Sequence, residues 1–122
     1  MTWRPLKPAE DTRQPTIDNV SIQTSIDGAG SSARGRVVIS WRTDEPATSQ
    51  VAYEQGSDKT IFSTKTPEDT GLSFEHVVIV TDLPTSRVYS IKPISYDKSR
   101  NASDGVVESA IVGRASDDIL TI

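Results

Sequence analysis

The amino-acid sequence predicts an all-β protein, an antiparallel β-sandwich of seven short strands. Valine and isoleucine outnumber leucine by 22 to 4, and serine and threonine supply 29 of the 122 residues. Residues branched at Cβ favour strands, and the chain is poor in strong helix formers. Apolar and polar residues alternate over short stretches that turn-forming residues separate, a pattern typical of a sandwich.

The beginning of the chain differs from the rest. Residues 1–14 combine prolines and charges with no apolar period and are predicted to form a linker or leader. From residue 15 the composition changes, and the spacing of the apolar residues predicts a first strand over 16–24. A long loop from Asp27 to Gly35, rich in glycine and serine, is expected to follow it.

Residues 36–42 form the most strongly predicted strand. Val37, Ile39 and Trp41 occupy every second position, so their side chains are expected to share one face, with Arg36, Ser40 and Arg42 on the other. That face is predicted to be the buried one.

The middle of the chain predicts three shorter elements. Asp44-Glu45-Pro46 is expected to end the preceding strand, and a new strand resumes over 49–54. After a turn at Gly56, a short strand is predicted over 60–64. Residues 65–72 are polar and are predicted to be loop.

Three more strands are predicted in the last third of the sandwich, over 74–81, 88–96 and 106–112, with a turn cluster over 98–105. The first of them is apolar on both faces, so the pattern leaves open which face is buried. Pro93 lies inside the second strand, where it cannot donate a ladder hydrogen bond, and it predicts a bulge.

The final residues, 113–122, are interpreted as a tail. Ser116-Asp117-Asp118 resembles a helix N-cap followed by acids, which favours the start of a following segment. A strand added to the sandwich edge is the alternative. Linker-like ends on both sides predict one module of a longer protein.

Two motifs carry a family resemblance. Residues 41–53, Trp-Arg-Thr-Asp-Glu-Pro-Ala-Thr-Ser-Gln-Val-Ala-Tyr, resemble the fibronectin type III domain, in the variant of exported bacterial proteins and of the N-terminal module of purple acid phosphatases. Leu83 and Tyr89 stand six apart, as in that family's corner between its fifth and sixth strands. The resemblance implies an immunoglobulin-like sandwich with Trp41 in the core and Tyr89 hydrogen-bonded to backbone near Leu83.

The resemblance covers residues 15–112, although the glycine that usually follows the tyrosine is displaced to Gly56. In such sandwiches two loops at one end often carry recognition, and loops on a rigid scaffold are the usual place for binding. The possible recognition residues in those loops are Asp44, Glu45, Lys98, Arg100 and Asn101.

Composition argues against several functions. The formal net charge is −4, which disfavours a polycationic nucleic-acid binder. The chain has no cysteine, hence no thiolate metal site, disulfide or cysteine nucleophile, and no run of 18 apolar residues that would span a membrane. We therefore expect no catalytic residue, cofactor or metal.

Two weaker chemical candidates are better explained by structure. His76 is the sole histidine and is expected to be a structural strand residue. Asp97, Asn101 and Asp104 offer oxygen ligands that suit calcium, but their spacing fits no calcium-loop template, and aspartate and asparagine favour turns in any case.

The sequence thus predicts a non-catalytic, monomeric module, a spacer or protein-interaction domain of a larger secreted or cell-surface protein. Its partners would be other domains of the same chain or a protein at the cell surface. The alternatives are an accessory module of a metallophosphoesterase similar to purple acid phosphatases, whose metal ligands belong to another domain, and a carbohydrate-binding sandwich.

Overall fold

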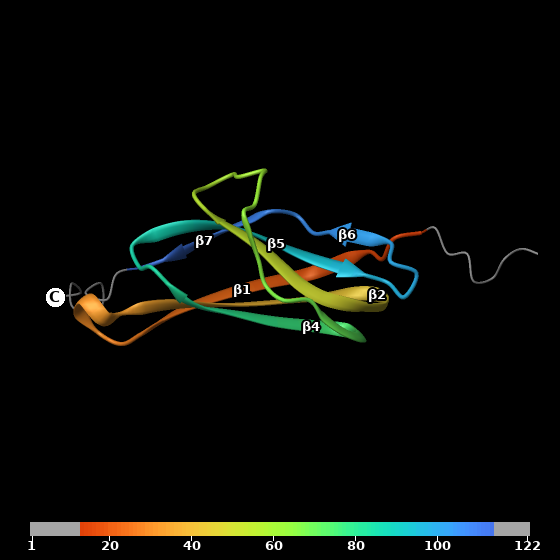
Figure 1. The fold of residues 1–122 in the computed structure, drawn as a ribbon, viewed down its shortest axis with the longest axis horizontal. Helices are drawn as coiled ribbons and strands as arrows, with labels where there is room; N and C mark the ends of the chain where they lie inside the picture. Colours follow the sequence, from red (N-terminus) through yellow and green to blue (C-terminus); the bar gives the residue numbers. More distant parts are fainter. Residues whose placement is uncertain (1–12, 114–122) are drawn as a thin grey trace, which may run out of the picture.

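The computed structural model describes residues 13–113, which fold into antiparallel β-structure (Figure 1). The elements are β1 Ile17–Asp27, a 3-10 turn Gly30–Ser32, β2 Arg34–Gln55, β3 Thr64–Lys65, β4 Asp69–Leu83, β5 Arg87–Tyr96, β6 Ala102–Asp104 and β7 Glu108–Val112. The prediction of an all-β chain with seven antiparallel strands is confirmed for this part of the chain. Most of the predicted leader and tail, residues 1–12 and 114–122, lies outside the described residues.

Strand β2 organises the pairing because its two halves belong to different ladders. Its first part, up to Ser49, pairs with β1 on one side and β4 on the other. Its last part, Gln50–Gln55, pairs with β5, and β3 pairs with it at Ala52 and Tyr53. The short strands β6 and β7 pair with the opposite side of β5.

The predicted alternation in the first half of β2 is confirmed. Val37, Ile39 and Trp41 are at most 1% exposed, while the residues of the other face are half-buried or, at Arg42, exposed. Burying a valine or isoleucine side chain contributes about 1.5–3 kcal/mol, so this face of β2 anchors the domain. The core contains Val37, Ile39, Trp41, Val51, Val80, Leu83, Tyr89, Ile91, Ala110 and Val112.

Two predicted boundaries around β2 and β4 are wrong. The chain stays extended through Asp44-Glu45-Pro46, and the ladder with β4 changes register there instead of ending. The fixed φ of proline is compatible with an extended backbone, and the buried residues 47–49 hold the chain in place. Residues 69–72, predicted as loop, already belong to β4, since Asp69 pairs with Ser49.

Two further corrections concern short elements. The strand predicted over 60–64 is absent, and β3 begins at Thr64, because Ile61 is 81% exposed and has no core to pack against. The predicted turn cluster over 98–105 contains β6, in which Ser103 is buried. Strand β1 extends three residues beyond the predicted end, because Ser25, Ile26 and Asp27 continue the ladder with β2.

The bulge predicted at Pro93 lies on the partner strand. The register between β5 and β2 is continuous through Pro93. On the other side of β5, Ile94 pairs with Asp104 and Ile91 with Glu108, so one extra residue lies between β6 and β7. The Pro93 carbonyl accepts a hydrogen bond from the Gly105 backbone N–H (2.8 Å). The position where Pro93 lacks an N–H therefore faces this interruption. As a result, the last strand starts at Glu108 and not at residue 106 as predicted.

Tyr89 ties the connection between β4 and β5. Its hydroxyl donates to the carbonyl oxygen of Pro84 (3.1 Å), next to Leu83, where the resemblance places the acceptor. Burial raises the pKa of Tyr89 above its ordinary value of 10.0. Tyr89 is 3% exposed and belongs to the core, so it contributes both apolar packing and a hydrogen bond.

We expect Tyr89→Phe to lower the free energy of unfolding by about 1 kcal/mol, the usual contribution of one hydrogen bond, because only the hydroxyl is lost. Tyr53→Phe is the matched control, since the Tyr53 hydroxyl makes no hydrogen bond within the described residues. Urea denaturation followed by circular dichroism measures both. Equal stabilities for the two variants would contradict the role given to the Tyr89 hydroxyl.

Candidate functional site

The two predicted recognition loops meet at one end of the molecule. An isolated β-bridge joins Ala47 to Asp97, and the Tyr96 backbone N–H donates to the Thr48 hydroxyl (3.0 Å). The irregular stretch of β2 over residues 44–48 and the loop between β5 and β6 thus form a single surface, at the end where β6 lies in Figure 1. We call this surface, residues 44–48 with 97–101, the loop end.

Asp44 and Glu45 fasten the chain as it enters the domain. The Asp44 carboxylate accepts hydrogen bonds from the Thr16 backbone N–H (2.8 Å) and from an Arg13 guanidinium nitrogen (2.9 Å). These two donors hold the pKa of Asp44 below its ordinary value of 3.8. Glu45 lies 3.7 Å from the same guanidinium. The two acids therefore position the segment before β1.

Arg100 and Asn101 are also held by neighbours. The Arg100 guanidinium makes two hydrogen bonds with the Glu68 carboxylate (2.8 and 3.2 Å) and lies 4.1 Å from the centre of the Tyr96 ring. Arg100 in turn lowers the pKa of Glu68 from its ordinary value of 4.5. Fork-shaped pairing and stacking together fix the planar guanidinium. Lys98 is exposed.

Asp97 organises the loop from inside, in agreement with the turn-forming role expected of it over calcium binding. Its carboxylate accepts from the backbone N–H groups of Ser99 and Asn101 and from the Asn101 side-chain amide, each at 2.9 Å. The residue is 1% exposed. Asp104, the other candidate calcium ligand, points to Lys92 at 3.1 Å instead. Residues 13–113 contain no group of three His, Asp or Glu side chains placed to hold a metal ion.

A buried polar cluster lies beneath the loop end. Trp41 stacks on the His76 ring with centroids 5.1 Å apart and 14° between the planes, and its indole N–H donates to the Ser95 hydroxyl (2.9 Å). The Ser95 hydroxyl donates onward to the Thr48 carbonyl (2.7 Å). These contacts connect the core tryptophan directly to the loop above it.

The hydrogen bonds of His76 indicate which ring nitrogen carries the proton. The Thr43 hydroxyl donates to the Glu45 carbonyl (2.8 Å), so it accepts from His76 Nε2–H at 2.8 Å. Nδ1 then accepts from the Ser49 hydroxyl (2.7 Å). A serine paired with a histidine is the arrangement of a hydrolase nucleophile, but His76 is 2% and Ser49 6% exposed, so a substrate does not reach them.

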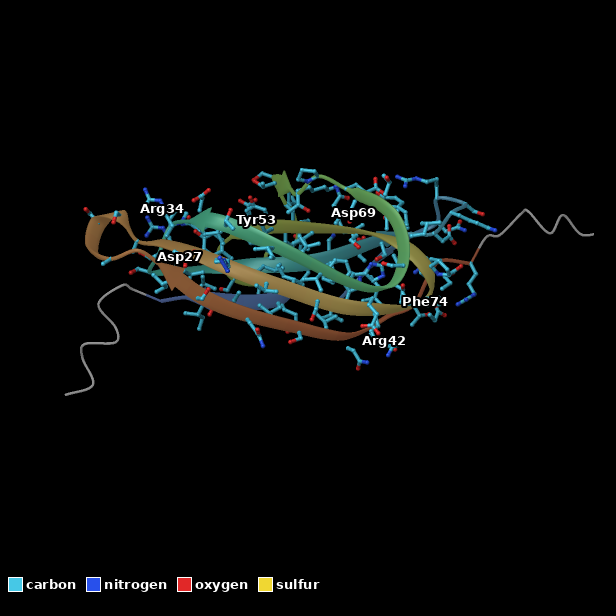
Figure 2. All side chains as sticks on the ribbon, turned by 90° about the horizontal axis from the view of Figure 1, so that it is seen from below. Asp27, Arg34, Arg42, Tyr53, Asp69 and Phe74 are labelled. Atoms are coloured by element: carbon cyan, nitrogen blue, oxygen red, sulfur yellow. The ribbon has the colours of Figure 1, made fainter. Side chains whose placement is uncertain are left out.

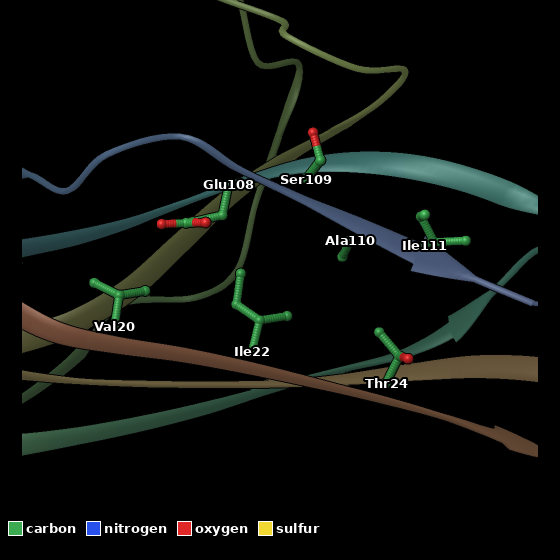
Figure 3. A pocket seen from close by; sticks show the side chains of 7 residues that line it. All are labelled: Val20, Ile22, Thr24, Glu108, Ser109, Ala110 and Ile111. Atoms are coloured by element: carbon green, nitrogen blue, oxygen red, sulfur yellow. The ribbon is translucent and has the colours of Figure 1, made fainter.

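A groove of about 370 Å³ separates β1 from β7 (Figure 3). The side chains of Val20 and Ile22 line it from β1, and Ala110 and Ile111 line it from β7. Glu108 is its one ionisable lining residue. Thr24 and Ser109 complete a lining of mixed polarity, which indicates no particular class of ligand.

Comparison with known proteins gives little. No protein-family profile and no curated protein sequence matches this chain. A crystal structure from Bordetella pertussis, solved under the name ApaA protein, is similar with a TM-score of 0.47 and 10% identity, over 85% of this chain and 98% of that one. This likeness is too distant to support an argument. Within residues 13–113, no helix has the length and apolar character needed to span a membrane.

Proposed function

We propose that this chain is a non-catalytic, fibronectin type III-like β-sandwich that serves as a spacer or protein-interaction module of a larger secreted or cell-surface protein. The passage of β2 from one ladder to the other supports the sandwich, since the ladder of β1, β2 and β4 and the ladder of β3, β2, β5, β6 and β7 share one core. The position of Trp41 in that core supports the family resemblance.

The observation that carries the spacer role is where the described chain enters and leaves. Arg13 is bound to Asp44 beside the loop end. Gly113 accepts a hydrogen bond from the Ser86 backbone N–H (3.1 Å), at the opposite end of the molecule (Figure 1). Entry and exit at opposite ends let the length of the domain add to the separation of whatever it joins.

The fastened loop end supports the same role. The Arg13–Asp44 and Arg100–Glu68 pairs hold the chain where it enters and the loop beside it. Exposed ion pairs add little to stability, so we assign these two pairs a role in orienting the chain. The carbohydrate-binding alternative gains nothing, because Trp41 and Tyr89 are buried. The metallophosphoesterase alternative depends on a second domain.

Small-angle scattering tests the spacer role. We expect the full chain, inserted between two unrelated globular domains, to increase the maximum dimension by about one domain length over a direct fusion of those two domains. A maximum dimension that hardly increases would mean that the domain does not separate what it joins, and it would contradict the proposal. Hydrolysis of phosphate esters, carboxylate esters or glycosides that His76→Ala abolishes would also overturn the non-catalytic assignment.

A further inference from the structure

Strand β4 has one unpaired edge. It pairs with β2 alone among the described strands, and it forms the lower margin of the molecule in Figure 1. Figure 2, seen from below, shows no other described strand in front of it. From Glu75 to Val80 its register with β2 is continuous, so the free edge presents a regular row of backbone N–H and C=O groups.

The outward side chains along this edge are apolar. Val77 and Ile79 are 62% and 53% exposed, whereas His76 and Val80 on either side of them are buried and Val78 between them packs partly against the core. An ion pair between Arg42 and Glu75 (3.6 Å) lies at one end of the apolar pair. Exposed apolar side chains on a regular free edge are what natural sheets usually avoid.

The other edge strands carry features that usually prevent pairing with a strand of another molecule. Strand β1 has a bulge where Asn19 adopts a φ of 55°, and its outward residues are polar. Strand β3 has two residues, and the extra residue between β6 and β7 breaks that edge. In β4, the stretch from Glu75 to Thr81 has no lysine, arginine, proline or glycine, and its irregularity comes only at Asp82, with a φ of 61°.

We infer that the Glu75–Thr81 edge of β4 pairs antiparallel with the same edge of a second copy, with the two-fold axis at Val78. In this register each Val77 lies opposite Ile79 of the other copy, and each Glu75 lies opposite Thr81. Four apolar side chains then form one patch across the seam, and no like charges are opposed. An axis at Val77 would instead set the Glu75 carboxylate against Ile79.

The self-complementary register is the reason for assigning a second copy in place of an unrelated peptide. Seven paired residues span about 23 Å, which is short for an interface and predicts a weak, concentration-dependent dimer. The closed two-fold symmetry leaves no further free β4 edge, so assembly stops at two chains. This inference departs from the expected monomer, and it does not depend on the proposed function.

Sedimentation velocity of the full chain, from micromolar to millimolar concentration, tests the dimer. We expect a monomer–dimer equilibrium in the wild type that Ile79→Lys weakens by about tenfold or more, since two ammonium groups would enter the seam. Ile111→Lys is the matched control: Ile111 is 69% exposed on β7 and should leave the equilibrium unchanged. A wild type that stays monomeric, or one that Ile111→Lys dissociates equally, overturns the inference.

Disulfide trapping tests the register, because the chain has no cysteine of its own. Opposed residues of antiparallel strands have Cα atoms about 4.5–5.5 Å apart, within disulfide range. We expect Val77→Cys and Ile79→Cys chains to cross-link with each other faster than either does with itself. Preferential Val77→Cys self-linkage would move the axis and overturn the register, and open-ended oligomers would overturn the closed pair.

Discussion

Trp41→Ala is expected to lower the free energy of unfolding by about 3–5 kcal/mol, the range for deleting a large buried aromatic side chain. Trp41 is 1% exposed and contacts both halves of the polar cluster, through its stacking on His76 and its hydrogen bond to Ser95. Small domains have only about 5–15 kcal/mol in total, so the variant should lose much of its folded population near body temperature.

Trp41→Phe separates packing from hydrogen bonding. Phenylalanine keeps an aromatic ring beside His76 but cannot donate to the Ser95 hydroxyl, and we expect it to cost about 1–3 kcal/mol. The matched control is Phe74→Ala, because Phe74 lies on β4 and is 49% exposed. Urea denaturation at neutral pH ranks the three variants. A Phe74→Ala loss as large as that of Trp41→Ala would contradict the central place given to Trp41.

The core was predictable where one face of a strand is buried and the other faces solvent. Val37, Ile39 and Trp41 alternate strictly because the ladder sets them against the core at every second position. The run of apolar residues from Val77 to Val80 has no such signal. Val77 and Ile79 face solvent on a free edge, and only their position in the sheet, which a single sequence does not contain, distinguishes them from core residues.

Irregular segments were predicted less well because long-range contacts shape them. Proline at position 46 suggested a break, yet Ser49 pairs with Asp69 and Ala47 with Ser73, and these partners keep the chain extended. Ile61 suggested a strand, but the fold provides no surface for it. Local propensity gave way to tertiary context in both places.

At the loop end, the sequence identified the candidate residues but not the partners that hold them. Its residues were identifiable because turn-forming acids and a basic cluster stand where the resemblance places two loops. Their partners were not: Arg13, Glu68 and Tyr96 are distant in sequence or unremarkable in pattern, and only folding brings them to Asp44 and Arg100. The organising role of Asp97 rests on donors within four residues, and the aspartate two positions before Ser99 is a local signal for such a turn.

Lowering the pH from about 7.5 to about 5.5 is expected to destabilise the protein through His76. Burial is the main cause that lowers the pKa of His76 below its ordinary value of 6.5, and the nearby Glu75 and Asp69 carboxylates act more weakly in the opposite direction. The neutral ring is already satisfied, since Nε2–H donates to Thr43 and Nδ1 accepts from Ser49. A proton on Nδ1 would require the Ser49 hydroxyl to turn away.

The direction of this pH effect follows from the number of protons that the folded and unfolded chains bind. Below pH 6.5 the unfolded chain binds a proton at His76 that the folded chain does not, so the free energy of unfolding falls as the pH falls. The slope has an upper limit of about 1.4 kcal/mol per pH unit and returns to zero below the folded-state pKa. Because Asp44, Glu54 and Glu68 have lowered pKa values, the stability that they contribute is lost only as the pH falls below their ordinary 3.8 and 4.5, a separate window.

His76→Gln is the control that isolates this group. Glutamine does not titrate, and its amide reaches toward Thr43, so the dependence of stability on pH between about 7.5 and 5.5 should disappear in the variant. The protein has a single histidine, and an NMR titration of its imidazole protons in the folded wild type therefore reads the same pKa even where the variant folds poorly. A folded-state pKa at or above 6.5 would mean that the carboxylates outweigh burial. Stability would then rise, or stay level, as the pH falls through this window, opposite to the sign expected from a ring enclosed by Trp41, Thr43 and Ser49.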